Sequence, residues 1–244
     1  MGYSIRMKSG LDEYTRNARL KPAFLVALPI ALTVAVLGFK QSAIEGTLFG
    51  LASSLGFTFL LSQLVRDRGK ARESWLFERW GGKPTTAMLR HSDTRLNVHT
   101  RVRYHVRLSS MLPEISLPSA EQEKANTTDA DAAYTSCGDY LLSKTRDKER
   151  FQLLFQENVN YGFRRNLWAM KPVGIAISTL SLVALALVTR IEARADAVPW
   201  FANLTAIAIV ALLLTWWIIR ITPSWVKIVA DAYAIRLLAS IDEL

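Results

Sequence analysis

Hydrophobic residues are concentrated in four long blocks of the chain, and polar sequence separates them. The blocks cover residues 22–39, 43–65, 172–189 and 199–219. Each block has roughly the 17–25 residues that a helix needs to cross the hydrocarbon core of a bilayer. Because lipid offers no hydrogen-bond partners to the backbone, each block is expected to form an α-helix. The pattern predicts an all-α polytopic membrane protein with four transmembrane helices, and it disfavours four buried helices of a soluble fold.

The links inside each pair of blocks are short. Residues 40–42 join the first two blocks, and residues 190–198 join the last two. Links of this length force antiparallel neighbours, so we expect two transmembrane hairpins, 22–65 and 172–219. A domain of residues 66–171 is inserted between the hairpins. An even number of spans places both chain termini on the same side of the membrane.

Charge decides which side that is. The chain has 30 Lys and Arg against 21 Asp and Glu, a formal net charge of +9. Cations are dense in the N-terminal segment 1–21 and in segment 66–107, whereas the two hairpin tips are nearly neutral. Basic segments stay in the cytoplasm, so both termini and the inserted domain are predicted to be cytoplasmic in a bacterial inner membrane. Trp200, Trp216 and Trp217 lie near the ends of the fourth block, where interfacial Trp side chains are common.

The second block carries small residues at helical spacing. They are Gly46, Gly50, Ser53, Ser54 and Gly56. Such a face lets two helix backbones approach closely, so it either packs against the first span or forms a subunit contact or a pore lining. The middle of every block is free of ionisable residues, which argues against a proton relay. Asn203 and Thr205, polar residues of the fourth block, are explained by hydrogen bonds between helices.

The inserted domain is expected to be helical. Apolar residues recur at helical spacing in three stretches, 94–112, 129–144 and 147–170. The residues expected on their apolar stripes are Val98, Val102, His105 and Leu112; Ala133, Cys137, Tyr140 and Leu141; and Phe151, Leu154, Phe155 and Val159. The C-terminal segment 220–244 is predicted to be an amphipathic cytoplasmic helix packed on the inserted domain or on a neighbouring subunit. Lys227, Asp231 and Arg236 make a fifth span costly.

Two segments of the inserted domain combine cations with aromatic and turn-forming residues. In segment 66–93, Gly81 and Gly82 permit backbone conformations closed to other residues, and Pro84 fixes the turn. Thr85 or Thr86 is placed to cap the next helix. The segment is either a structural elbow or a phosphate-binding elbow. The predicted ligand-binding residues of this segment are Trp80, Lys83, Thr85, Thr86, Arg90, His91 and Asp93, backed by Arg101 beyond its end.

The second of these segments covers residues 157–172. Its predicted ligand-binding residues are Asn158, Tyr161, Arg164 and Arg165. Arginine forks suit phosphates, and aromatic rings stack on nucleic-acid bases. The alternative is a basic helix next to the membrane that contacts anionic lipid head groups.

The sequence carries no recognisable pattern of a catalytic or metal site. His91, His99 and His105 lack the H-E-x-x-H spacing and have no Cys partner. Cys137 is the single cysteine, and we expect it in a hydrophobic core. We therefore expect no enzymatic activity, no catalytic residue, no metal and no cofactor.

Two long motifs carry a resemblance to a known family. They are R-D-x-G-K-x-x-E-x-x-L-F-x-x-W-G-G-x-P-T-T-x-x-L-R-H-x-D over residues 66–93 and F-x-x-L-F-x-E-N-V-N-Y-G-F-R-R-N-L-W over residues 151–168. Nearly the whole chain resembles a bacterial family of four-span proteins, which we associate with the membrane effector of the Hailong anti-phage system. The resemblance implies a homo-oligomeric ion channel, with a tetramer favoured. A partner nucleotidyltransferase would make short single-stranded DNA oligomers that hold the channel closed, and its opening would depolarise the cell. The alternative is a non-conducting membrane scaffold that recruits a cytoplasmic protein.

Overall fold

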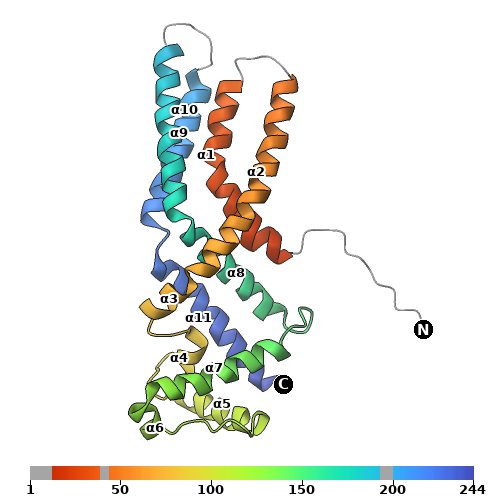
Figure 1. Ribbon diagram of the computed structural model, residues 1–244, viewed down its shortest axis with the longest axis vertical. Helices are drawn as coiled ribbons and strands as arrows, with labels where there is room; N and C mark the ends of the chain where they lie inside the picture. The colour runs from red at the N-terminus through yellow and green to blue at the C-terminus, as the bar shows by residue number, and fades with distance from the viewer. Residues whose placement is uncertain (1–12, 39–43, 193–199) are drawn as a thin grey trace, which may run out of the picture. The chain divides into compact units, whose positions relative to one another are not determined.

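The computed structural model describes residues 13–38, 44–192 and 200–244, and within these ranges the chain is helical with no strand (Figure 1). The chain divides into two compact units. The apolar unit consists of Met1–Gly69 and Asn166–Ile221, and the polar unit consists of Lys70–Arg165 and Thr222–Leu244. The all-helical fold class is confirmed for the described residues.

Four long apolar helices and one short π-helix are described in the apolar unit. They are η1 (Thr15–Leu20), α1 (Lys21–Gly38), α2 (Ile44–Ala71, up to Gly69), α9 (Lys171–Glu192) and α10 (Trp200–Ile219). Among the described residues, three segments are long and apolar enough to cross a membrane: Thr15–Val36, Lys171–Arg190 and Phe201–Ile219. The predicted span 43–65 falls largely on α2, but many of its side chains lie outside the described part of the chain. A fourth span therefore stays a prediction.

Many large apolar side chains of the apolar unit are exposed, although others, such as Leu185 and Trp217, are buried. The large apolar side chains of Phe24, Leu180 and Leu212 are 53%, 69% and 71% exposed. By contrast, Ser178 and Asn203 are 0% and 3% exposed. Exposed large apolar side chains together with buried small and polar ones are typical of helix packing in lipid, where close approach and hydrogen bonds drive association. The apolar unit is therefore compatible with association with a membrane.

The contact between α9 and α10 depends on a glycine. A Cβ atom added to Gly174 would lie 2.4 Å from Cε2 of Trp217, so the indole ring occupies the space that the glycine leaves. Trp217 is 0% exposed, which corrects the prediction that it anchors the helix at a membrane interface. Its neighbour Trp216 is half-buried. The sequence pattern cannot distinguish these two rings, because only the position of the facing glycine selects one of them for packing.

Polar residues of α10 behave in two ways. The side-chain amide of Asn203 donates from Nδ2 to Oγ1 of Thr189 on α9, over 2.7 Å. This confirms the expected hydrogen bond between helices. Thr205 instead donates to the carbonyl oxygen of Phe201 in its own helix, so its hydrogen bond does not join two helices.

Shorter helices make up the polar unit. They are α3 (Glu73–Arg79), α4 (Pro84–Leu89), α5 (Val98–Met111), α6 (Ala120–Ala125), α7 (Thr127–Lys144), α8 (Gln152–Ala169, up to Arg165), α11 (Pro223–Ala239) and η3 (Ser240–Asp242). Polar residues define their starts: Asn97 caps α5, Ser119 and Gln122 form a capping box on α6, and Thr222 caps α11 ahead of a proline at the first turn.

The core of the polar unit surrounds α4, whose six residues are all buried. This short helix contacts α7 and α11, and its Met88 and Leu89 belong to one hydrophobic cluster with Leu108 of α5, Tyr134 of α7 and Leu237 of α11. The C-terminal helix α11 therefore packs on the inserted domain, one of the two placements predicted for it. Cys137 is fully buried in the same cluster, as expected.

The stripe predicted over residues 94–112 is right only in part: Leu112 is buried and His105 is half-buried, but the two valines face outward. Val98 and Val102 are 53% and 54% exposed, whereas Arg101, Tyr104 and Leu108 are buried. The larger Tyr and Leu side chains remove more apolar surface from water than valines do, and this decides which face packs. The predicted stripe on α8 agrees better, since Phe151, Leu154 and Val159 are all buried.

Candidate functional site

The predicted elbow is a tight turn between α3 and α4. Gly81 and Gly82 have φ angles of +78° and +133°, a region that side chains with a Cβ rarely adopt. The backbone N–H of Gly82 donates to the carbonyl oxygen of Phe77 over 2.8 Å, which closes the turn. Pro84 then occupies the first turn of α4, where its missing N–H costs nothing. The two glycines are therefore required by the backbone path.

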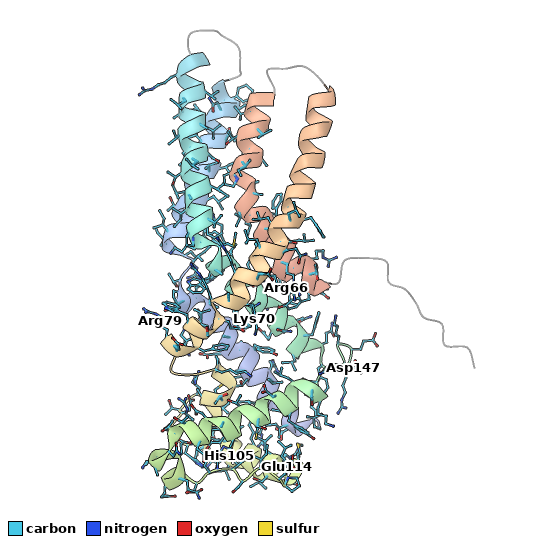
Figure 2. The ribbon with its side chains drawn as sticks, viewed as in Figure 1. Arg66, Lys70, Arg79, His105, Glu114 and Asp147 are labelled. Atoms are coloured by element: carbon cyan, nitrogen blue, oxygen red, sulfur yellow. The ribbon has the colours of Figure 1, made fainter. Side chains whose placement is uncertain are left out.

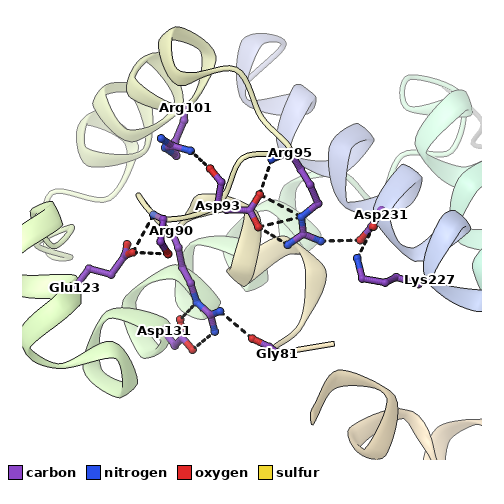
Figure 3. Close-up of polar contacts among 10 residues, drawn as sticks. Gly81, Arg90, Asp93, Arg95, Arg101, Glu123, Asp131, Lys227 and Asp231 are labelled. Atoms are coloured by element: carbon purple, nitrogen blue, oxygen red, sulfur yellow. Dashed lines mark hydrogen bonds and ion pairs between the residues drawn. The ribbon is translucent and has the colours of Figure 1, made fainter. Parts of the chain in front are cut away.

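Arg90, at the C-terminal end of α4, connects this turn to α7 through hydrogen bonds (Figure 3). Its guanidinium donates from Nε and Nη2 to the two carboxylate oxygens of Asp131 on α7, over 2.7 and 2.6 Å. Its Nη1 donates to the carbonyl oxygen of Gly81 over 2.8 Å. The hydrogen bond to Asp131 raises the pKa of Arg90 above its usual value. This is the bidentate geometry that arginine also offers to phosphate, and a carboxylate of the same chain fills it here.

An alternating chain of charges follows the elbow. Asp93 accepts from Arg95 at distances of 2.6–3.1 Å, Arg95 donates to Asp231 of α11 over 2.8 Å, and Lys227 donates to the same carboxylate over 2.6 Å. Burial would raise the pKa of Asp93, but hydrogen bonds from Arg95 outweigh it and lower that pKa. Arg101 of α5 donates to the backbone carbonyl of Asp93. The loop after α4 is thereby tied to both α5 and α11.

The carboxylate of Glu123 on α6 accepts hydrogen bonds from His91 and Ser92 in the loop after α4. It receives hydrogen bonds from the backbone N–H of His91 over 2.7 Å, from the N–H and hydroxyl of Ser92, and from the Tyr134 hydroxyl over 3.0 Å. Burial acts to raise the pKa of Glu123, yet these donors lower it overall. The carboxylate is therefore held ionised by the loop that it anchors.

Two histidine rings meet beside this carboxylate. The rings of His91 and His105 are edge to face, with centroids 4.9 Å apart. Their Nε2 atoms lie 3.0 and 2.7 Å from the carbonyl oxygens of Pro118 and Leu89. A carbonyl oxygen only accepts, so each Nε2 donates. Burial lowers the pKa of His105, which favours its neutral form.

A second polar cluster joins α3 to α8 inside the polar unit. Glu73, 8% exposed, accepts from Arg165 and Lys70 over 2.6 Å each and from the Tyr161 hydroxyl over 2.8 Å. The ring of Tyr161 stacks on Tyr233 of α11 at an interplanar angle of 3°. Burial acts to raise the pKa of Glu73, but the nearby Arg165 charge and these hydrogen bonds lower it.

The other predicted elbow residues are also engaged within the polar unit. Lys83 pairs with Asp139 over 3.2 Å, and the hydroxyls of Thr86 and Thr135 are 3.0 Å apart. Neither predicted threonine caps α4, because Lys83 occupies the cap position and the threonines lie within the helix, which corrects that expectation. Among the described atoms, the buried Thr85 hydroxyl has no hydrogen-bond partner. The half-buried ring of Trp80 lies 6.1 Å from that of Phe77.

Two of the predicted ligand residues of α8, Arg164 and Arg165, have partners inside the polar unit. Arg164 donates to the carbonyl oxygen of Trp225 over 2.9 Å, and its guanidinium lies over that indole, 4.7 Å from the ring centroid. Asn158 is half-buried. Internal contacts therefore hold Arg164 and Arg165, whose cationic groups had suggested phosphate or lipid contact. The ligand assignment for both segments stays a prediction.

The small-residue face of α2 is described at only one position. The side-chain surroundings of Gly46, Gly50, Ser53 and Ser54 lie outside the described residues. Gly56 is exposed, and a Cβ added there would meet no described atom within 4 Å. At this position the helix does not pack closely against another described part of the chain.

Sequence reasoning found the cations of the site and missed the acids that face them. Asp131 and Glu123 gave little local signal, because Arg90, His91 and Ser92 are 31–41 residues away from them in the chain. Asp231 lies four residues after Lys227, but its other partner, Arg95, is 136 residues away. Glu73 is buried, and its spacing of three residues from Lys70 was a local hint of that pair. Among the described residues, no group of three or more His, Cys, Asp or Glu side chains is placed to hold a metal ion.

The arrangement is therefore a set of arginine forks closed by carboxylates of the same chain. Such forks bind an added anion only if it replaces the internal carboxylate or reaches donors that remain unused. Comparison with protein-family models, with curated proteins and with solved structures found no match to this chain. The family resemblance seen in the two motifs remains an expectation.

Proposed function

We propose that this protein is an integral membrane protein of four spans whose subunits assemble into an ion channel under the control of the polar unit. The exposed apolar surface of the apolar unit carries this proposal. Its helices expose large side chains such as Phe201 (61%) and Ile219 (71%) and bury Ser181 (5%). Exposed apolar surface on this scale is costly in water and favourable in lipid.

The second span of the proposal is the apolar part of α2. This helix is 28 residues long, more than a bilayer crossing requires. Its described side chains Phe59 and Leu60 are 54% and 69% exposed, as lipid-facing residues would be. Four spans place both termini and the basic segments on the cytoplasmic side of a bacterial inner membrane, in accord with the distribution of Lys and Arg.

The pore of the proposal is formed between subunits, with a tetramer favoured by the family resemblance. The open space at Gly56 supports this, because the small-residue face of α2 is available there to another helix or to a water-filled path. Polar groups inside the membrane are otherwise expensive. A narrow pore lined by Gly46, Gly50, Ser53, Ser54 and Gly56 would conduct ions through small hydroxyl and backbone groups rather than charged rings.

The controlling ligand of the proposal is a short single-stranded DNA oligomer made by a partner nucleotidyltransferase. Its phosphates would replace Asp131 on Arg90 and neighbouring carboxylates on the other forks. Because each phosphate contact releases counterions, oligomer affinity should fall steeply with salt. Release of the oligomer would open the channel and depolarise the membrane.

Ion flux in vesicles tests the proposal. Purified full-length protein is reconstituted into liposomes loaded with a potassium-sensitive dye, with and without DNA oligomers of three to ten nucleotides. We expect flux without oligomer and closure with it. Arg90→Gln should weaken closure, and the exposed Arg146→Gln should serve as a matched control that leaves it unchanged. Vesicles that remain ion-tight in every condition would overturn the channel, and flux indifferent to all oligomers would overturn the ligand.

One observation favours the alternative of a non-conducting scaffold. Val98, Val102 and Val106 form a stripe on α5 that is 53%, 54% and 66% exposed. Three exposed valines on one helix face suit a protein contact. A scaffold predicts that a cytoplasmic protein copurifies with the wild type and is lost when the three valines are changed to Ser, while liposomes show no conductance.

A further inference from the structure

One end of the apolar unit gathers four helix termini. The side-chain amide of Asn166 donates to the carbonyl oxygen of Ala18 over 2.7 Å, just before α1, and it also lies against Gly69 near the end of α2. At the start of α9, Lys171 donates to the carbonyl oxygens of Ile218 and Ile221 at the end of α10, over 2.9 Å each. The starts of α1 and α9 and the ends of α2 and α10 therefore share this end.

Exposed cations surround that end. We call them the collar cations: Arg16, Lys21, Arg66, Arg68 and Arg220. Figure 2 shows Arg66 toward the C-terminal end of α2. The described acidic residues near them are Glu13 and Asp67, so the end is strongly positive. At the opposite end of the same helices, the sequence has one cation, Arg190, and two acids, Glu45 and Glu192.

The collar cations differ in their partners from Arg90, Arg95 and Arg165 of the polar unit. Arg90, Arg95 and Arg165 each lie within 2.8 Å of a carboxylate oxygen. Among the described residues, no carboxylate lies within ion-pair distance of a collar cation. Carboxylates of the polar unit neutralise these three arginines, whereas the collar leaves its charge for an external anion.

Each helix also places a large apolar or amphipathic side chain on the same face as a collar cation. Phe24, 53% exposed, follows Lys21 by three residues, and Leu64, 42% exposed, precedes Arg68 by four. Residues three or four apart are neighbours on a helix surface. Trp216 stands in the same relation to Arg220, and an indole suits the boundary between head groups and acyl chains. The partner of this surface needs an anionic head next to an apolar chain.

We infer that the collar cations bind the phosphate groups of anionic phospholipids, whose acyl chains lie along the neighbouring apolar side chains. A nucleic acid supplies the phosphates without the apolar part. This inference rests on the proposed membrane location. It moves lipid recognition from Arg164 and Arg165, which have internal partners, to the ends of α1, α2 and α10.

Lipid binding to the delipidated full-length protein tests the inference. The protein in detergent is titrated with phosphatidylglycerol or phosphatidylcholine, and bound lipids are counted by native mass spectrometry. The collar variant combines R16Q, K21Q, R66Q and R68Q. A matched control variant, R72Q, K124Q, R146Q and R236Q, removes four exposed cations of the polar unit. Each juxtamembrane cation contributes about fivefold to the affinity for an anionic membrane surface.

The expected result is that wild type prefers phosphatidylglycerol, that the collar variant loses this preference by at least about tenfold, and that the control variant keeps it. Equal binding of both lipids by wild type, or equal losses in the two variants, would overturn the inference. Should the collar variant aggregate, R66Q with R68Q and a salt titration of wild type replace it; phosphatidylglycerol binding must then weaken with salt while phosphatidylcholine binding does not. Ion flux in vesicles is a separate readout, so lipid preference and conductance can fail independently.

Discussion

Replacing Glu73 by alanine removes the acceptor from a buried cluster of donors. Glu73 and Arg165 have side chains that are each 10% exposed and lie 2.6 Å apart. Removing one partner of a buried ion pair costs about 3–5 kcal/mol, because the other charge is left uncompensated. The Tyr161 hydroxyl also loses its acceptor, whereas Lys70, 75% exposed, regains water and contributes little. We expect a loss of about 4 kcal/mol from the stability of the polar unit.

Thermal melting of the full-length protein in detergent, followed by Trp fluorescence, measures this loss. For a unit of this size, 4 kcal/mol lowers the melting temperature by roughly 10 °C or more. Glu78→Ala is the matched control, since Glu78 is an exposed residue of the same helix α3. Equal melting temperatures for Glu73→Ala and wild type would refute the reasoning, as would an equal decrease in the control.

Two further predictions concern packing in the apolar unit and the effect of acid on the polar unit. Gly174→Ala should weaken the contact between α9 and α10 by about 1–3 kcal/mol through overpacking, because its Cβ would lie 2.4 Å from the Trp217 ring, and should lower the melting temperature. The control Gly56→Ala, at an open position, should change the melting temperature little. Equal effects of the two substitutions on the melting temperature would contradict this prediction. Acid should destabilise the polar unit in two steps: the lowered pKa of His105 makes the unfolded chain bind a proton first below about 6.5, and the lowered pKa of Glu123 does the same below about 4.5. Each contribution to stability is present above the unfolded-state pKa and is lost as the pH falls through the folded-state pKa. Melting temperatures measured over a series of pH values test this. If the His105→Gln protein still shows the step at the higher pH, the assignment of that step to His105 is wrong.

Helix positions in the apolar unit could be predicted closely from the sequence. The blocks 172–189 and 199–219 correspond to α9 (Lys171–Glu192) and α10 (Trp200–Ile219). Their uniform hydrophobicity is a strong signal, since only a helix satisfies the backbone in lipid. The choice of Trp217 over Trp216 for packing depended on Gly174 in another helix, and a linear pattern holds no information on such a pair.

In the polar unit, the sequence supplied the turn at Gly81 and Gly82 but not the destinations of its charges. Arg95 and Asp231 are 136 residues apart in the chain, yet they pair over 2.8 Å. Local spacing cannot reveal such contacts, and a basic segment read in isolation looks open to phosphates. The exposed valines of α5 illustrate the same limit, because burial is decided by competition among whole helix faces rather than by one stripe.

The most direct test of the four-span topology is to determine on which side of the membrane the tip of the first hairpin lies. A cysteine is introduced by Gln41→Cys at the tip or by Arg146→Cys in the polar unit, and intact and inverted vesicles are treated with a membrane-impermeant maleimide. Native Cys137 provides a low background, because it is fully buried and burial raises the pKa of its thiol to about 11. Four spans predict labelling of Gln41→Cys from the outer face and of Arg146→Cys from the cytoplasmic face. Labelling of both positions from the same face would contradict the four-span account, because α2 would then not cross the membrane.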